Sequence, residues 1–146
     1  MNMMRELYGQ IIMDHYHRPR NKGELKNADL EEHLLNPLCG DEVTVYAMFD
    51  GDKVADVKFS GRGCSISQAS ASMMTERLRG QSRGEIEEEI KGFKDMMTGD
   101  REFPEDDELA ALKGVIQYPS RIRCATLAWN AFQQGMEGTG EWSADT

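Results

Sequence analysis

The stretch EVTVYAMFDGDKVADVKFSGRGC, residues 42–64, decides the fold expected for this chain. Two runs of alternating apolar residues lie on either side of the pair Asp50-Gly51. These residues are Val43, Val45, Ala47 and Phe49 in the first run, and Ala55, Val57 and Phe59 in the second. Alternation with period two is typical of β-strands, and Asp-Gly favours a tight turn. The sequence therefore predicts an antiparallel hairpin with strands at 42–49 and 54–60.

Helical periodicity lies on both sides of this hairpin. The expected helices are residues 4–16, Ile66 to about Arg79, a helix opened by the capping-box spacing Ser82–Glu85 and lined as far as Met97, the short segment 109–118, and a last helix from Pro119 through Met136. The last helix has an apolar stripe at spacings of three and four: Ile122, Ala125, Trp129, Phe132 and Met136. We expect residues 24–38 to form a loop with a turn of helix, and 98–108 an acidic loop.

Length and charge limit the class of protein. The chain has 146 residues, which suits one domain, expected at 1–138, followed by a loose tail at 139–146. Its 17 basic and 26 acidic side chains give a net charge of −9, which argues against nucleic acid as a partner. No apolar run approaches the length of a membrane span, and the first ten residues lack a signal-peptide core. We expect a cytoplasmic protein with no membrane partner.

The three cysteines, Cys39, Cys64 and Cys124, form no C-x-x-C motif, and a disulfide framework is improbable in a reducing cytosol. They are buried filler, metal ligands or reactive groups. Cys64 and Cys124 are expected in or beside the first turn of a helix, where the helix dipole favours a thiolate. Cys39 is expected on a glycine-containing turn before the first strand. The two ends of the hairpin can therefore bring these thiols together.

Asp41 follows Cys39 with a single glycine between them, in NPLCGDEV. Three thiolates leave a tetrahedral zinc ion one ligand short, and the Asp41 carboxylate can supply the fourth. A Cys₃Asp site of this kind suits a metal site that opens, more than a closed structural zinc site. The alternative is that each cysteine is a small buried apolar residue and that Gly-Asp is only a turn.

Four motifs together resemble the U-type iron–sulfur cluster assembly family, which includes IscU and the NifU N-terminal domain, and within it the SufU branch. The motifs are LYGQIIMDHYHRPRNKG (7–23), NPLCGDEV (36–43), SGRGCSISQASASMM (60–74) and RIRCATLAW (121–129). The resemblance covers about residues 5–137. It implies an α+β fold of the SufE/IscU-like type, in which a small three-stranded antiparallel sheet packs against several helices.

The resemblance also implies a metal site and a partner. The metal ligands of the family map onto Cys39, Asp41, Cys64 and Cys124, and in the SufU branch the metal is Zn²⁺. The partner implied is a SufS-like, PLP-dependent cysteine desulfurase, with a SufBCD-like scaffold downstream. In the family mechanism a histidine of the desulfurase replaces Cys39 on zinc, and the freed thiolate attacks the persulfide sulfur. No turnover is expected without that enzyme.

Two departures separate the branches of the family. The histidine that precedes the last cysteine in IscU-type scaffolds is Arg123 here, and an acidic insertion at about residues 92–113 precedes the last helix. Arg123 either pairs with Asp41 or a sulfur substrate, or forms a surface salt bridge. These changes weaken the alternative function, an IscU-like scaffold that assembles an Fe–S cluster on the same ligands. A cysteine hydrolase and a purely structural zinc module are the remaining alternatives.

The histidines are weaker candidates for metal ligands. His15 lies on the apolar face of the first helix, and we expect it to be a satisfied core histidine, that is, a buried side chain whose ring nitrogens have hydrogen-bond partners. His17, beside Arg18 and Arg20, suits a docking surface, and His33 stands in the expected loop.

Overall fold

The hairpin expected from residues 42–64 forms two neighbouring strands of the sheet. Strand β2 (Asp41–Asp50) pairs antiparallel with β3 (Lys53–Arg62), and Tyr46 stands opposite Lys58. Gly51 lies in the connecting turn with a φ of 63°, in the left-handed region that glycine adopts without a steric penalty. The prediction for this stretch is confirmed, and both strands are slightly longer than expected.

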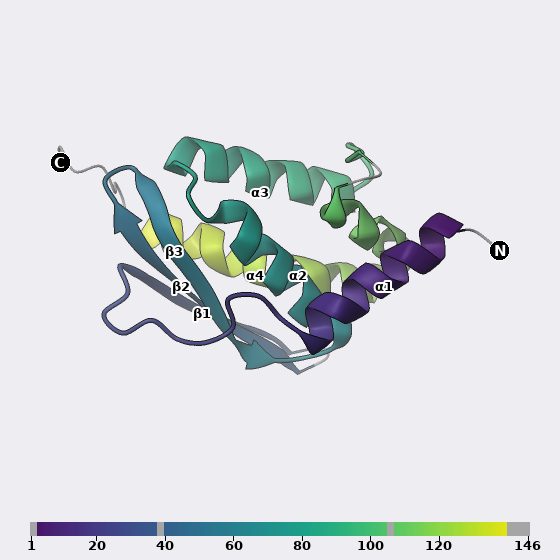
Figure 1. Cartoon of the computed structure of the whole chain (residues 1–146), viewed down its shortest axis with the longest axis horizontal. Coiled ribbons are helices and arrows are strands. Elements are labelled where there is room, and N and C mark those ends of the chain that lie inside the picture. Colours follow the sequence, from purple (N-terminus) through teal and green to yellow (C-terminus); the bar gives the residue numbers. More distant parts are fainter. Residues whose placement is uncertain (1–2, 38–39, 105–106, 140–146) are drawn as a thin grey trace.

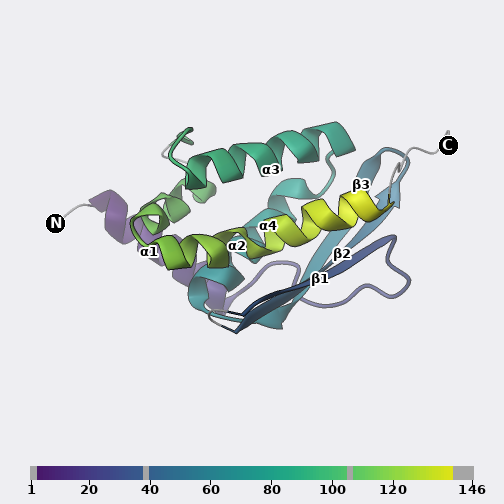
Figure 2. The same cartoon turned by 180° about the vertical axis from the view of Figure 1, so that it is seen from behind.

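The computed structural model describes residues 3–37, 40–104 and 107–139. Its elements in chain order are α1 (Met3–His17), β1 (Leu30–Asn36), β2, β3, α2 (Ser65–Leu78), α3 (Arg83–Met97), the 3₁₀ helix η1 (Glu108–Gln117) and α4 (Pro119–Thr139). The sheet lies on one side of the molecule and the helices on the other (Figures 1 and 2). The expected α+β architecture is confirmed.

Strand β1 corrects one prediction and confirms another. It pairs antiparallel with β2, so the strand order is β1-β2-β3, as the resemblance implied. The loop expected over 24–38 was wrong for Leu30–Asn36. This edge strand, LEEHLLN, buries only its first and last residues, and Glu31 and His33 are exposed. Its sequence therefore has no apolar alternation to reveal it.

Helices α2 and α4 cover one face of the sheet, and α3 packs on α4 on the side away from the sheet (Figures 1 and 2). Helix α1 lies against α2 and η1. The core between these layers is formed largely by Leu30, Val45, Val57, Phe59, Met74, Leu78, Ile86, Phe93, Leu112, Trp129 and Phe132. Burial of this apolar surface fixes how the helices sit on the sheet.

The helix starts expected from the sequence are mostly confirmed. The capping box is formed: the Ser82 hydroxyl accepts from the Glu85 N–H, and the Glu85 carboxylate accepts from the Ser82 N–H. The short helix expected at 109–118 is a 3₁₀ helix. Its apolar residues Leu109, Leu112 and Val115 are three apart and buried, which is the spacing of one 3₁₀ face.

Helix α4 buries four of its five expected stripe residues, and the fifth, Ile122, is partly buried. Residues 140–146, where the loose tail was expected, lie outside the described part of the chain. Across residues 3–37, 40–104 and 107–139, we find no helix with both the length and the apolar character of a membrane span.

Candidate metal centre

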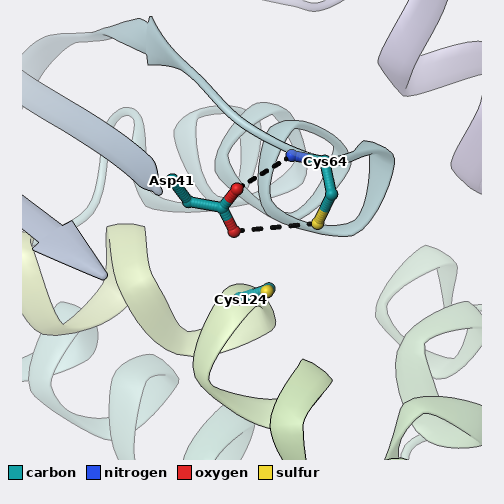
Figure 3. A group of neighbouring side chains, drawn as sticks. All are labelled: Asp41, Cys64 and Cys124. Carbon is teal, nitrogen blue, oxygen red and sulfur yellow. Dashed lines mark hydrogen bonds between the residues drawn. The ribbon is translucent and has the colours of Figure 1, made fainter. Parts of the chain in front are cut away.

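Asp41 and Cys64 meet where β2 begins and α2 begins. Asp41 is the first residue of β2, and its side chain is buried. Cys64 is the N-cap of α2, and its own side chain makes no capping bond. Instead, the Cys64 N–H donates to Asp41 Oδ1 at 3.0 Å, and the Cys64 thiol lies 3.7 Å from Asp41 Oδ2 (Figure 3). The carboxylate is thus held at the positive end of a helix, where negative charge is favoured.

Two glycines allow this close approach. In the register of the hairpin, Gly61 stands opposite Val43, and a Cβ on Gly61 would lie 2.2 Å from the Glu42 carbonyl oxygen. A Cβ on Gly63 would lie 2.7 Å from Asp41 Oδ1. In the structure Gly61 belongs to β3 and Gly63 follows it, and their role is to admit neighbouring atoms.

Cys124 joins the pair from α4. Its side chain is fully buried, and its sulfur contacts the Asn36 amide nitrogen at 4.0 Å and the Ser120 carbonyl oxygen at 3.9 Å. The sequence predicted Cys124 in the first turn of this helix, and that prediction was wrong. Because α4 begins at Pro119, Cys124 lies in the second turn, past the four free N–H groups. The helix-end argument for a thiolate therefore does not apply to Cys124.

One carboxylate oxygen of Asp41 and the sulfurs of Cys64 and Cys124 all lie within 4.8 Å of one another. The three side chains converge from β2, α2 and α4 (Figure 3). The expected meeting of the hairpin ends with the last helix is thus seen for these three residues. Cys39, the fourth candidate ligand and the proposed sulfur acceptor, lies outside the described residues.

Buried hydrogen bonds fix the two helices that carry the thiols. Ser70 on α2 donates its hydroxyl proton to the Ala125 carbonyl oxygen at 2.5 Å. The same hydroxyl oxygen accepts from the Trp129 indole N–H at 2.9 Å. The Trp129 ring is stacked on Phe93 with the ring centroids 4.2 Å apart. Since Ala125 follows Cys124, the Ser70 bond sets the separation of the two helices at the site.

Arg121 is the site residue that sequence reasoning missed. Hydrogen bonding to Cys124 raises the pKa of the Arg121 guanidinium, and the charges of Cys64 and Cys124 raise it further. The side chain is exposed and lies one turn before Cys124 on α4. The sequence singled out Arg123 instead. Arg123 is also exposed, and within the described residues its guanidinium forms no ion pair.

The histidines do not join this centre. His15 is buried, with Nδ1 2.7 Å from Ser72 Oγ and Nε2 3.2 Å from Glu108 Oε2, so the expected satisfied core histidine is confirmed. His33 lies on β1 with Nε2 3.7 Å from a Glu42 oxygen. His17 ends α1 and is exposed.

The donor set fits a borderline-soft cation. Two thiols and one carboxylate are ligands that zinc and iron accept, whereas magnesium and calcium favour oxygen alone. Asp41 Oδ1 accepts the Cys64 N–H, and Oδ2 is the oxygen that faces the Cys64 thiol. The described part of the site thus offers three ligands.

Comparison with known proteins agrees with this geometry. The NifU-like N-terminal domain family matches residues 7–138. The chain is 47% identical over 133 residues to the zinc-dependent sulfurtransferase SufU of Bacillus subtilis, covering 89% of each protein. It is 39% identical to the iron–sulfur cluster assembly scaffold protein IscU of Streptococcus pyogenes, over 94% of this chain and 87% of that protein.

A solved structure shares the fold as well. The protein FiSufU of the thermophile Fervidobacterium islandicum superposes with a TM-score of 0.81 at 38% identity. The match covers 90% of this chain and 97% of FiSufU.

Proposed function

Because this chain belongs to the family of NifU-like N-terminal domains, we propose that it is a zinc-dependent sulfur acceptor in iron–sulfur cluster assembly. It receives sulfur on Cys39 from the persulfide of a PLP-dependent cysteine desulfurase. The observation that carries this proposal is the convergence of Asp41, Cys64 and Cys124 within 4.8 Å from three separate elements. The resemblance to a zinc-dependent sulfurtransferase supports the choice of metal and reaction.

The proposed ligands are Cys39, Asp41, Cys64 and Cys124. Asp41 would bind through Oδ2, because its other oxygen accepts the Cys64 N–H. Zinc bound there would hold the coordinating sulfurs as thiolates. Only Gly40 separates Cys39 from Asp41 in the sequence, and its φ of 71° lies in the left-handed region that glycine adopts without a steric penalty.

The transfer step uses the nucleophilicity of a thiolate. The Cys39 sulfur attacks the terminal sulfur of the desulfurase persulfide. A new S–S bond forms on Cys39, the S–S bond on the enzyme breaks, and the enzyme's cysteine leaves as a thiolate. The exposed guanidinium of Arg121 faces the two neighbouring thiols and offsets negative charge there.

The surroundings of the site suit a protein partner. Leu35 and Tyr118 are among the most exposed large apolar side chains, at 53% and 57%. Leu35 precedes Asn36, whose amide contacts the Cys124 sulfur, and Tyr118 precedes α4. Apolar and aromatic side chains exposed beside a reactive centre are typical of docking surfaces. We infer that the desulfurase docks here, with a SufBCD-like scaffold as a downstream recipient of the sulfur.

The second candidate is an IscU-like scaffold that builds an Fe–S cluster on the same ligands. The IscU proteins of Streptococcus pyogenes and Thermotoga maritima, at 39% and 35% identity, favour it. The same two thiols and carboxylate would serve a cluster.

Metal analysis and a sulfur-transfer assay together test the proposal. We expect the protein purified without added metal to contain about one zinc per chain and no iron, and to increase alanine production by a cysteine desulfurase. We expect Cys39→Ala to abolish that increase and the persulfide on this chain. Iron with sulfide in place of zinc would favour the scaffold. Full stimulation by Cys39→Ala would contradict the acceptor role.

A further inference from the structure

A second group of ligand-type side chains lies outside the cysteine centre. We propose that His15, Glu76 and Glu108 form a second metal site, which takes a divalent transition-metal cation such as Zn²⁺ or Fe²⁺. The three residues come from α1, α2 and η1. None of them belongs to the proposed ligand set for sulfur transfer, so this site stands independently of that function.

The ligand atoms are already close together. One atom from each of the three side chains lies within 4.8 Å of the other two, and His15 Nε2 is 3.2 Å from Glu108 Oε2. Zinc binds imidazole nitrogen and carboxylate oxygen at about 2.0–2.2 Å, so its ligand atoms lie about 3–3.6 Å from one another. The His15–Glu108 distance already lies in this range, and the Glu76 ligand atom is within 4.8 Å of both.

Ser72 orients the His15 ring from behind. Its hydroxyl oxygen lies 2.7 Å from His15 Nδ1 and accepts the Arg20 N–H at 2.9 Å. A histidine ligand almost always has such a partner on its second nitrogen, because that bond fixes the ring and its tautomer. A hydroxyl can accept as well as donate, so Ser72 can accept Nδ1–H when a metal occupies Nε2. This bond is independent of the two carboxylates.

The burial of the three side chains differs in a way that suits a metal site. His15 is completely buried, whereas Glu76 and Glu108 are exposed. Nε2 of a buried, fixed imidazole therefore faces the Glu108 carboxylate, the Glu76 carboxylate lies close by, and both carboxylates are open to water. A cation bound there would keep solvent on its outer side, which leaves coordination positions for water ligands.

The nearby cation Arg20 is already engaged. Its guanidinium binds an Asp14 oxygen at 2.6 Å. The hydrogen bond to Asp14 is the main cause of its raised pKa, and the charges of Glu76 and Glu108 raise that pKa less. Arg20 is thus held by Asp14, and a divalent cation would bring positive charge directly against the two glutamates.

The chemistry of the set selects the kind of metal. One imidazole and two carboxylates suit zinc, ferrous iron, manganese or cobalt, and the absence of sulfur among these three disfavours Cu(I).

A bound cation would tie η1 to α1 and α2. The neighbouring residue Asp107 already anchors the start of η1 through two bonds to Arg77, at 2.7 and 2.8 Å.

Co²⁺ is a probe that distinguishes this site from the cysteine centre. The full chain is first loaded with one equivalent of zinc and then titrated with Co²⁺, and the ring resonances of the three histidines are followed by NMR. We expect the His15 signals to shift or broaden before those of His17 and His33. We expect no sulfur-to-cobalt charge-transfer band, because no thiolate binds this cobalt.

The variant to compare is Glu76→Gln with Glu108→Gln, two exposed positions whose replacement leaves the core intact. We expect it to need at least tenfold more Co²⁺ for the same His15 shift. The control is Glu87→Gln with Glu88→Gln on α3, which removes the same charge and leaves the titration unchanged. Unperturbed His15 signals at a tenfold excess of Co²⁺, or equal titrations for both double variants, would overturn the second site.

Discussion

The Asp41 carboxylate accepts the backbone N–H of Cys64 with one oxygen and faces the Cys64 thiol with the other. One side chain therefore joins the start of β2 to the start of α2 and presents an oxygen to the thiols. Its structural and chemical roles belong to different oxygens, so substitutions can separate them.

Asp41→Asn should lower zinc affinity by at least tenfold and leave the fold almost unchanged. The amide oxygen can still accept the Cys64 N–H, but a neutral amide is a much poorer zinc ligand than a carboxylate. Asp41→Ala removes both functions and should also cost about 2 kcal/mol of unfolding free energy, the typical value of a hydrogen bond to a charged group. Zinc competition with a chelator and urea unfolding of the metal-free protein measure the two effects. Equal unfolding free energies for both variants would contradict a structural role for Oδ1.

Gly63→Ala should destabilise the protein by about 1–3 kcal/mol, the usual cost of overpacking. The added Cβ would lie 2.7 Å from Asp41 Oδ1 and 2.4 Å from Ser67 Oγ. The added Cβ would force the Asp41 carboxylate to shift, and this shift is costly because Asp41 is buried. Zinc binding should therefore weaken together with stability.

Gly84→Ala is the matched control. A Cβ there meets nothing within 4 Å, and alanine in a helix is up to about 1 kcal/mol better than glycine. Urea unfolding should therefore show opposite signs for the two substitutions. A neutral Gly63→Ala would mean that the approach of β3 to Asp41 tolerates a methyl group.

The parts of the fold that were predicted have a periodic pattern in the sequence. The hairpin alternates because only one of its faces lies under the helices, and α4 has an apolar stripe because one side of it faces the core. Strand β1 has neither pattern, since its outward side chains, such as Glu31 and His33, are polar at the sheet edge. Pairing with β2 decides its conformation, and no local signal in LEEHLLN indicates that pairing.

The sequence predicted the part of the site whose residues are brought together by chain connectivity. Asp41 and Cys64 lie at the two ends of one hairpin, so the strand register alone brings them together. The position of Arg121 depends instead on how α4 docks and rotates on the sheet. On the predicted helix, Arg121 lies one turn before Cys124 and shares its face, whereas the adjacent Arg123 does not, so helical spacing was a signal for Arg121, and the packed structure places its guanidinium against the thiols.

The ion pair between Asp14 and Arg20 makes stability depend on pH. Hydrogen bonds from Arg20 and then Arg18 lower the pKa of Asp14 below its ordinary 3.8. A lowered carboxyl pKa stabilises the folded state above the unfolded pKa, and that contribution is lost as the pH falls through the folded pKa. Asp14→Asn should therefore reduce the unfolding free energy at pH 6, and the difference from the parent protein should disappear towards pH 2. Thermal unfolding across this range tests it, and a constant difference would contradict the assignment.

Arg121→Ala should slow sulfur acceptance from a desulfurase by about tenfold, which corresponds to about 1.4 kcal/mol. The Arg121 guanidinium is a positive charge against the Cys64 and Cys124 sulfurs, so its loss leaves the developing negative charge of the site less balanced. Both the parent and the variant should bind one zinc and unfold at nearly the same urea concentration, since the side chain is exposed.

Arg123→Ala is the matched control for this substitution. It removes the same charge from the same helix, two residues away, and Arg123 forms no ion pair within the described residues. We expect its rate of sulfur acceptance to stay within twofold of the parent protein, and Arg121→Lys to recover part of the rate, because lysine restores charge without the guanidinium geometry. The measurement is single-turnover transfer from a desulfurase persulfide. An equal loss of rate for Arg121→Ala and Arg123→Ala would assign the effect to the net charge of α4, and not to contact between Arg121 and the thiols.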